Sequence, residues 1–158
     1  ASILDMVERA MPGRVQNVYA HSSGGGKFIA VIQFKKTVPS DEGRQRQAAL
    51  LAFSAFPELK QVILVDEDVD IFDTNDVLWA MTTRMQADVD IVTIPGVRCH
   101  PLDPSNDLAC SWSIRDHGIA CKTIYDATVP FNQKARFQRA KFMEVDVKKF
   151  LPDFTVQD

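Results

Sequence analysis

The sequence has no strong excess of charge of either sign, no long apolar run and few cysteines. Its 18 basic and 21 acidic residues give a formal net charge of −3, which argues against a nucleic-acid-binding protein that relies on a strongly positive surface. No apolar run approaches the roughly 20 residues that a membrane-spanning helix needs. Charged side chains interrupt the apolar residues at the start of the chain, which is not typical of a signal peptide. We therefore expect neither a nucleic-acid partner nor a membrane association.

Cysteine occurs only at Cys99, Cys110 and Cys121, and no two of them form a CxxC pair. An odd number of cysteines without a secretion signal is typical of reduced thiols in a cytoplasmic protein. Nothing close to them in the sequence favours a reactive thiolate, so we interpret all three as buried or loop thiols and not as nucleophiles.

The composition is otherwise that of a folded protein, with 46% hydrophobic and 25% charged residues in a chain of 158. A chain of this length buries about 70% of the surface that its unfolded form exposes. We therefore expect residues 1–158 to form a single domain.

Apolar periodicity in the first half of the chain predicts alternating helices and strands. Helical spacing covers residues 2–11. Two strands over 15–21 and 27–36 form a hairpin joined by a glycine-rich turn. A helix follows that begins with Ser40 as its cap and ends near Phe56. The β-branched run 61–65 predicts a buried central strand.

The second half predicts a helix over 74–84, capped by residues 74–76. Its inward face would consist of Val77, Leu78, Ala80 and Met81. The elements that follow are predicted as a strand over 88–94, a long loop over 95–118, a strand over 119–125, a basic helix over 134–142 and a short helix after residue 144. This order predicts an α/β fold, a single layered domain with a mixed β-sheet and helices packed on it.

An acidic cluster directly follows the predicted central strand, and it consists of Asp66, Glu67, Asp68, Asp70 and Asp73. Carboxylates at the end of a strand can hold a divalent cation, as a small metal-dependent glycosyl or nucleotidyl transferase would require of Asp66, Asp68 and Asp70. The alternative is a solvated turn whose acids pair with Arg84 or cap the next helix. We favour the turn, because no histidine joins the carboxylates.

Two other motifs have simple structural interpretations. The segment 24–27 (GGGK) lacks the spacing of a phosphate-binding loop and precedes a strand, so it is interpreted as a hairpin turn. The basic residues of 134–141 would suit a phosphate or an acidic partner, but a solvated helix face is the default interpretation.

His100 is the histidine whose context is most typical of a functional site. It lies in the segment 98–105 (RCHPLDPS), directly after a predicted strand, where a proline-containing loop can direct a side chain into a cleft. A neutral imidazole there can exchange a hydrogen bond with a phenolic hydroxyl. His21, next to a turn, and His117, in the long loop, are interpreted as surface residues.

Several segments together resemble the C-terminal domain of the UbiD family, which consists of reversible decarboxylases that use prenylated FMN. The matching segments are 12–36 (PGRVQNVYAHSSGGGKFIAVIQFKK), 59–96 (beginning LKQVILVDEDVD), 100–105 (HPLDPS) and 122–131 (KTIYDATVPF). The HPLDPS loop and the end of the chain (KTIYDATVPF…RAKFMEVD) are most similar to the subunits C of the non-oxidative hydroxyarylic acid decarboxylases, which act on hydroxybenzoates.

The resemblance implies a mechanism in which the modified flavin forms an adduct with the aromatic acid, carbon dioxide leaves and a carboxylic acid protonates the ring carbon. In the family, an Arg and two Glu residues catalyse these steps from a larger N-terminal domain. That domain also holds the flavin with a divalent metal (Mn²⁺ or similar) and K⁺, and a flavin prenyltransferase supplies the cofactor. We expect this chain to begin after that region, to carry no catalytic or metal-binding residue of its own and to be inactive alone.

Some roles carry over position by position. By resemblance, His100, Pro101 and Leu102 line the substrate pocket, and His100 faces the ring hydroxyls. Some members have a basic residue near the cofactor phosphate where this sequence has Ser54. By resemblance, nearby Lys60 is a candidate to replace that basic residue as a ligand of the phosphate.

The resemblance also implies that the acidic turn has a structural role and does not bind a metal. It further implies that this domain makes contacts in a homodimer or a higher homo-oligomer. The transferase and a stand-alone oligomerisation module remain the alternatives.

Overall fold

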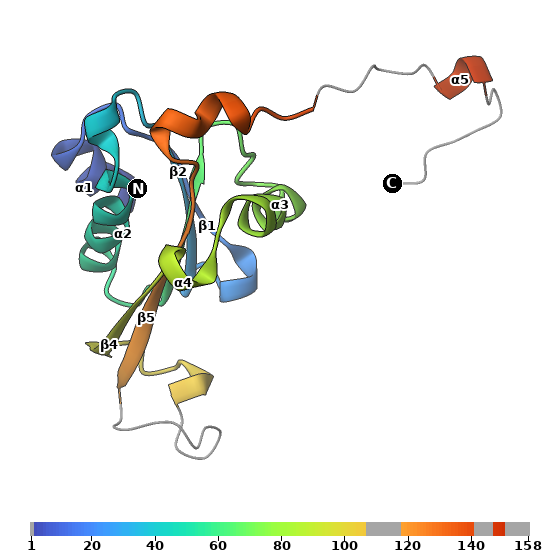
Figure 1. Ribbon diagram of the computed structural model, residues 1–158. Helices are drawn as coiled ribbons and strands as arrows, with labels where there is room; N and C mark the ends of the chain where they lie inside the picture. The colour runs from blue at the N-terminus through green and yellow to red at the C-terminus, as the bar shows by residue number, and fades with distance from the viewer. Residues whose placement is uncertain (1, 107–117, 141–146, 151–158) are drawn as a thin grey trace.

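The protein is built around a five-stranded mixed β-sheet with helices on both faces (Figure 1). The computed structural model describes residues 2–106, 118–140 and 147–150. In spatial order, the strands are β1 (Val15–Ala20), β2 (Ile29–Phe34), β3 (Gln61–Asp66), β5 (Ile119–Ala127) and β4 (Ile91–Arg98). The predicted α/β fold with a mixed sheet is confirmed.

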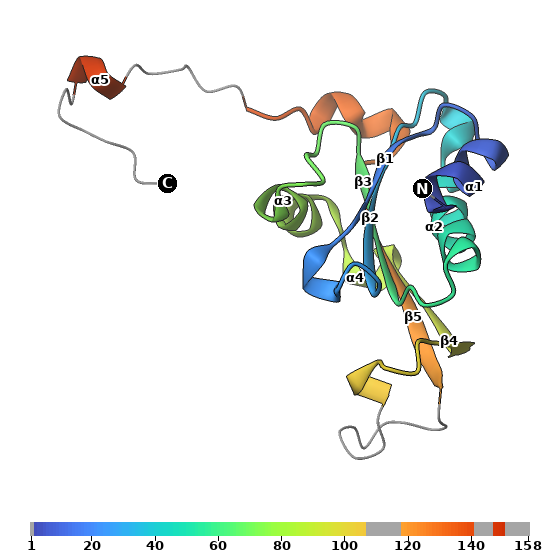
Figure 2. The ribbon, with the colours of Figure 1, turned by 180° about the vertical axis from the view of Figure 1, so that it is seen from behind.

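The helices lie in two layers. Figure 1 and the opposite view in Figure 2 show α1 (Ser2–Ala10) and α2 (Arg44–Ala55) on one face of the sheet and α3 (Thr74–Arg84) on the other. In the parts of the chain that the structure describes, no helix has the length and apolar character needed to cross a bilayer.

Strand direction gives the sheet two chemically different ends. β2, β3 and β5 are parallel neighbours, with Ile29 opposite Gln61 and Gln61 opposite Thr123. The edge strands β1 and β4 run antiparallel to their neighbours. The amino ends of the three central strands therefore lie together at one end of the sheet, and their carboxyl ends lie together at the other.

The core follows the two-residue period of the strands. Ala30, Ile32 and Phe34 of β2 pack toward α1 and α2, whereas Val31 between them packs toward α3. Small residues of α2, such as Ala48 and Ala52, are fully buried and let the helix approach the sheet closely.

The start of α2 differs from the prediction, since Ser40 does not cap it. Residues Pro39–Asp41 form a separate 3₁₀ turn, and α2 begins at Arg44. The carboxylate of Asp41 accepts hydrogen bonds from the backbone N–H groups of Thr37 (2.8 Å) and Val38 (3.2 Å). This buried side chain stabilises the turn and delays the helix.

The segments around α3 and β4 also correct the prediction. Asp73, and not the segment 74–76, caps α3 by accepting from the backbone N–H of Asn75. Leu78 is 52% exposed and does not face inward. The strand expected from residue 88 begins only at Ile91, because Ala87–Asp90 form the short helix α4, and β4 continues past Pro95 to Arg98.

The basic helix predicted over 134–142 is absent within its described part. Phe131–Arg136 form a 3₁₀ helix, and residues 137–140 are not helical. Ion pairs of Lys134 with Glu67 and of Arg139 with Asp68 and Asp76 tie this segment to the domain. The short helix α5 (Val147–Phe150) follows. Residues 107–117, with Cys110 and His117, and residues 141–146 lie outside the described residues.

Candidate functional site

Charged side chains gather at both ends of the parallel strands. At the amino ends lies a group that we call the amino-end cluster, made of Lys27, Glu58, Lys60, His100, Asp103 and Lys122. At the carboxyl ends lies a hollow that we call the β3 pocket, lined by Asp66, Glu67, Asp68, Arg84, Val129, Lys134, Gln138 and Arg139.

The amino-end cluster is supported by a buried lysine on β5. The Nζ of Lys122 donates to the carbonyl oxygens of Pro57 (2.6 Å) and Leu59. These two carbonyls flank Glu58 in the loop between α2 and β3. Burial lowers the pKa of Lys122. Its Nζ also lies over the ring of Phe53, 5.1 Å from the ring centroid. The lysine therefore fixes the backbone on both sides of Glu58.

A second lysine connects this loop to the segment after β4. The Nζ of Lys60 lies 2.8 Å from Oδ2 of buried Asp103 and also donates to Ser105. Although burial raises the pKa of Asp103, the hydrogen bonds from Lys60 and Ser105 outweigh it and lower that pKa. The two loops that carry Glu58 and His100 are thus held together.

His100 is buried in this junction, with 8% of its surface exposed. Its Nδ1 accepts a hydrogen bond from the backbone N–H of Leu102 (3.0 Å), so a neutral ring carries its proton on Nε2. Nε2 lies 3.4 Å from Oε2 of Glu58. Phe28 contacts the imidazole edge to face, with ring centroids 5.8 Å apart.

The exposed groups of the cluster are Glu58 and Lys27. The side chain of Glu58 is 39% exposed and that of Lys27 is 51% exposed, and their charged atoms are 3.9 Å apart. Glu58 is therefore a carboxylate that contacts a histidine and a lysine and remains accessible to a ligand.

The structure brings together two residues that the sequence singled out, His100 and Lys60. Pro101 and Leu102 are exposed beside them, Leu102 by 76%. The positive charge of Lys60 is paired with Asp103, so binding a cofactor phosphate would require this pair to break. Ser54 lies on α2 and donates to the carbonyl of Leu50.

Sequence reasoning missed Glu58, Lys27 and Lys122 as parts of this site. Glu58 and Lys27 lie in turns, where charged residues are common and carry no distinctive signal. Lys122 did have a recognisable signal in the sequence, since a lysine within a predicted strand must either face solvent or find hydrogen-bond acceptors.

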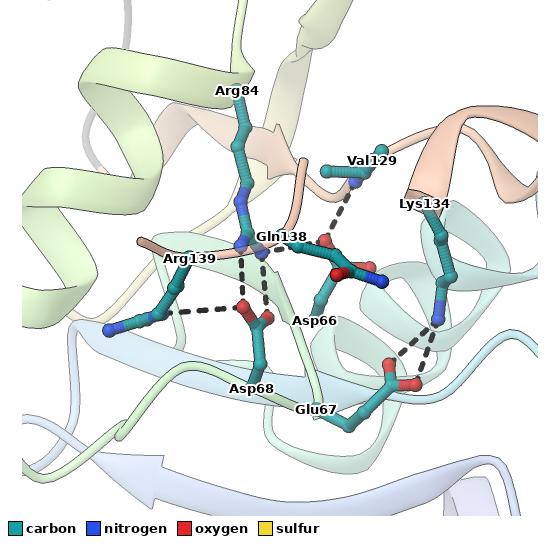
Figure 3. A pocket seen from close by; sticks show the side chains of 8 residues that line it. All are labelled: Asp66, Glu67, Asp68, Arg84, Val129, Lys134, Gln138 and Arg139. Carbon is teal, nitrogen blue, oxygen red and sulfur yellow. Dashed lines mark hydrogen bonds and ion pairs between the residues drawn. The ribbon is translucent and has the colours of Figure 1, made fainter. Parts of the chain in front are cut away.

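The β3 pocket has a volume of about 450 Å³, and its charges are paired (Figure 3). Arg84 is almost completely buried and donates to Asp66 (2.9 Å) and to both oxygens of Asp68 (2.8 and 2.6 Å). Lys134 contacts Glu67 at 2.8 Å.

Asp66 also accepts from the backbone N–H of Val129 (2.8 Å), and burial raises its pKa. The predicted pairing of the acidic turn with Arg84 is confirmed for Asp66 and Asp68, whereas Asp70 accepts from the backbone N–H of Phe72. Over the described ranges, no group of three or more His, Cys, Asp or Glu residues is arranged to hold a metal ion.

Comparison with known proteins gives consistent matches. The family model for the 3-octaprenyl-4-hydroxybenzoate carboxy-lyase C-terminal domain, UbiD_C, matches residues 1–127. The chain is 58% identical to a gallate decarboxylase of Lactiplantibacillus plantarum over 96% of its own length and 31% of the relative. It therefore spans about a third of the length of this relative.

Two solved structures extend the comparison. An apo 3,4-dihydroxybenzoic acid decarboxylase from Enterobacter cloacae matches with a TM-score of 0.86 and 63% identity, over 97% of this chain and 31% of that one. A UbiD-class enzyme from Pelotomaculum thermopropionicum in complex with FMN matches with a TM-score of 0.79 and 32% identity, over 97% of this chain and 32% of that one. The sequence-based recognition is thereby confirmed, and the chain belongs to the UbiD C-terminal domain family, among relatives that are decarboxylases.

Proposed function

We propose that this chain is the C-terminal domain of a longer non-oxidative aromatic acid decarboxylase of the hydroxybenzoate type. The observation that carries the proposal is its identity of 58% and 63% with decarboxylases of gallate and 3,4-dihydroxybenzoate. Both named substrates are benzoates with ring hydroxyls, and the amino-end cluster presents polar groups suited to such hydroxyls.

The role that we propose for the domain is to form one wall of the substrate pocket. His100, Pro101 and Leu102 would lie in that wall, on a loop stabilised by the Lys60–Asp103 ion pair (2.8 Å). A rigid wall orients the ring and excludes water, which are the contributions that a protein makes to a reaction whose chemistry belongs to the cofactor. The catalytic Arg and Glu residues would come from a separate domain.

Lys60, the predicted phosphate ligand, is paired with Asp103, so its charge is not free for the phosphate of a flavin, and its role stays a prediction. We propose that prenylated FMN, its divalent metal and K⁺ are held mainly by the catalytic domain, and that a flavin prenyltransferase supplies the cofactor. The predicted cytoplasmic location is consistent with such a dependence.

We also propose that this domain contacts further copies of the protein in a homodimer or a higher oligomer. Exposed apolar side chains on and beside its helices support this, among them Leu50, Phe72 and Leu78. The alternative of a metal-dependent transferase finds no support in the β3 pocket, whose carboxylates are paired with cations.

The proposal is tested by coexpressing the full-length protein with a flavin prenyltransferase and following 3,4-dihydroxybenzoate and gallate by chromatography. We expect carbon dioxide release by the full-length protein and none by the 158-residue chain. Activity of the short chain supplied with prenylated FMN, or inactivity of the full-length holoenzyme on every hydroxybenzoate, would contradict the proposal.

A further inference from the structure

We propose that Glu58 is the residue that receives the ring hydroxyl of the aromatic acid, and that His100 acts through Glu58 as a positioning residue. This inference rests on the proposed function, because it names the hydroxyl-binding group of the same pocket. It is carried by the burial of His100 beside Glu58, the accessibility of Glu58 and the rigidity of the loop that holds Glu58.

One ring nitrogen of His100 is hydrogen-bonded, and the other lies near Glu58. A neutral imidazole has one donor and one acceptor nitrogen. The acceptor, Nδ1, is used by the backbone N–H of Leu102 at 3.0 Å. The remaining proton is on Nε2, which lies 3.4 Å from Oε2 of Glu58. The ring is less accessible to a substrate hydroxyl than the carboxylate beside it, since 8% of His100 and 39% of the Glu58 side chain are exposed.

Glu58 has the accessibility that His100 lacks, since 39% of its side chain is exposed. A carboxylate offers about four lone-pair positions, and the contacts of Glu58 with His100 and Lys27 both involve Oε2. The distances of 3.4 and 3.9 Å are long for charged partners. Polar contacts in ligand-free sites are often long and shorten when substrate binds.

The backbone that carries Glu58 is fixed although its side chain is exposed. Lys122 donates to the carbonyls of Pro57 and Leu59 on either side of it. The backbone N–H of Leu59 donates to Phe56 (3.0 Å), and that of Lys60 donates to Phe28 (3.0 Å). The backbone beneath the carboxylate is thus fixed before the substrate arrives, whereas the side chain itself is held only by long contacts.

An acceptor of this kind predicts a specific chemical preference. A carboxylate can only accept a hydrogen bond, so it favours a phenolic hydroxyl, which donates, over a methoxy group, which cannot. A site built to bond a hydroxyl rejects the analogue that lacks it, because the protein group loses its partner. A hydrogen bond to a charged group corresponds to about 10- to 100-fold in binding.

The test uses the full-length holoenzyme with Glu58→Gln, assayed on 3,4-dihydroxybenzoate and on its two monomethyl ethers. We expect kcat/KM for the dihydroxy acid to fall by about 10- to 100-fold and its preference over at least one ether to be lost. Glu58→Asp should retain part of the preference. Glu67→Gln is the matched control, because Glu67 is a similarly exposed carboxylate paired with a lysine at the other end of the sheet.

Two results would overturn the inference while leaving the proposed function intact. One is an equal loss on all three substrates in Glu58→Gln, which would indicate a structural role only. The other is an unchanged preference. A wild-type holoenzyme without activity on any of these acids would instead contradict the proposed function.

A second measurement does not depend on activity. The ¹⁵N chemical shifts of the neutral His100 ring in the 158-residue chain distinguish its tautomers. We expect the Nε2–H form in the wild type and in Glu58→Gln, since Leu102 fixes the proton position. An Nδ1–H ring would overturn the proposed arrangement, because Nδ1 could not then accept from Leu102.

Discussion

The amino-end cluster and the β3 pocket both combine carboxylates with basic side chains, but they use them differently. In the β3 pocket, Arg84 is almost fully buried and bonds to its acids at 2.6–2.9 Å. In the amino-end cluster, Glu58 is partly exposed and its contacts are 3.4 and 3.9 Å long. Short, buried pairs stabilise a fold, whereas a loosely held carboxylate on a rigid loop remains available to a ligand.

The comparison also bears on a general rule for α/β sheets, in which ligands bind beyond the carboxyl ends of the strands. Here the β3 pocket lies at the carboxyl ends, and its carboxylates form ion pairs with Arg84, Lys134 and Arg139 (Figure 3). The carboxylate whose contacts are all long, Glu58, lies at the amino ends. The pocket wall that we propose lies at the opposite end of the sheet from the one that the rule selects.

The largest expected effect is that of Arg84→Met in the β3 pocket. It leaves the buried carboxylate of Asp66 without its cation and removes the stacking of Arg84 on Trp79. We expect the free energy of unfolding to fall by about 3–5 kcal/mol, measured by urea denaturation of the chain. Asp68→Asn, at a partly exposed partner, should cost clearly less. Equal losses would remove the distinction between buried and exposed pairs.

Asp41→Asn tests a buried, hydrogen-bonded carboxylate that belongs neither to the amino-end cluster nor to the β3 pocket. Burial raises the pKa of Asp41, but hydrogen bonds from the backbone of Thr37 and from Arg14 outweigh this and lower it to about 2. Because the folded pKa is below the unfolded value of 3.8, the contribution to stability is complete above about pH 5 and is lost progressively as the pH falls to about 1.

At neutral pH we expect Asn at position 41 to cost roughly 2 kcal/mol. The difference between wild type and variant should shrink between pH 4 and pH 2 in denaturation experiments. A difference that does not change over this range would show that the charge of Asp41 contributes nothing.

Lys122→Met tests the support of the amino-end cluster. The two carbonyls of Pro57 and Leu59 lose their donor, while the cost of burying a charged amine is relieved. We expect a net loss of about 1 kcal/mol, together with faster hydrogen exchange at the amides of Leu59 and Lys60. Lys27→Met, at an exposed lysine, is the control and should leave exchange at these amides unchanged.

The smallest expected effect on stability is that of Glu58→Gln. Its side chain is partly exposed and its contacts are long, so the free energy of unfolding should change by less than about 0.5 kcal/mol. Measured beside the substrate preference, this separates a binding role from a structural one. A loss of several kcal/mol would indicate that Glu58 has a structural role, like the ion-paired carboxylates of the β3 pocket.

Local patterns in the sequence predicted most of the fold. Alternating apolar residues identified β2, the β-branched run 61–65 identified β3, and the spacing of Val77 and Ala80 identified the buried face of α3. Two of the errors lie where side chains make long-range contacts. Asp41 stabilises the turn before α2 through the backbone of Thr37 and Val38 and also pairs with Arg14. Residues 137–140 are not helical where Arg139 contacts Asp68, in the turn after β3, and Asp76 of α3.

By itself, the sequence determined the α/β class, the family and the two segments from which a site could be built, the acidic turn and the loop of His100. Only the tertiary structure decided which of their charged groups are paired and with which partners. The acids of the turn are bonded by Arg84, Lys134 and Arg139, which lie 16 to 71 positions away in the chain. Conversely, the loop of Glu58 is held by Lys122 of β5. This lysine donates to the carbonyls of Pro57 and Leu59, which lie 65 and 63 positions away in the chain. Such pairings depend on which strands become neighbours, and no local pattern in the sequence encodes them.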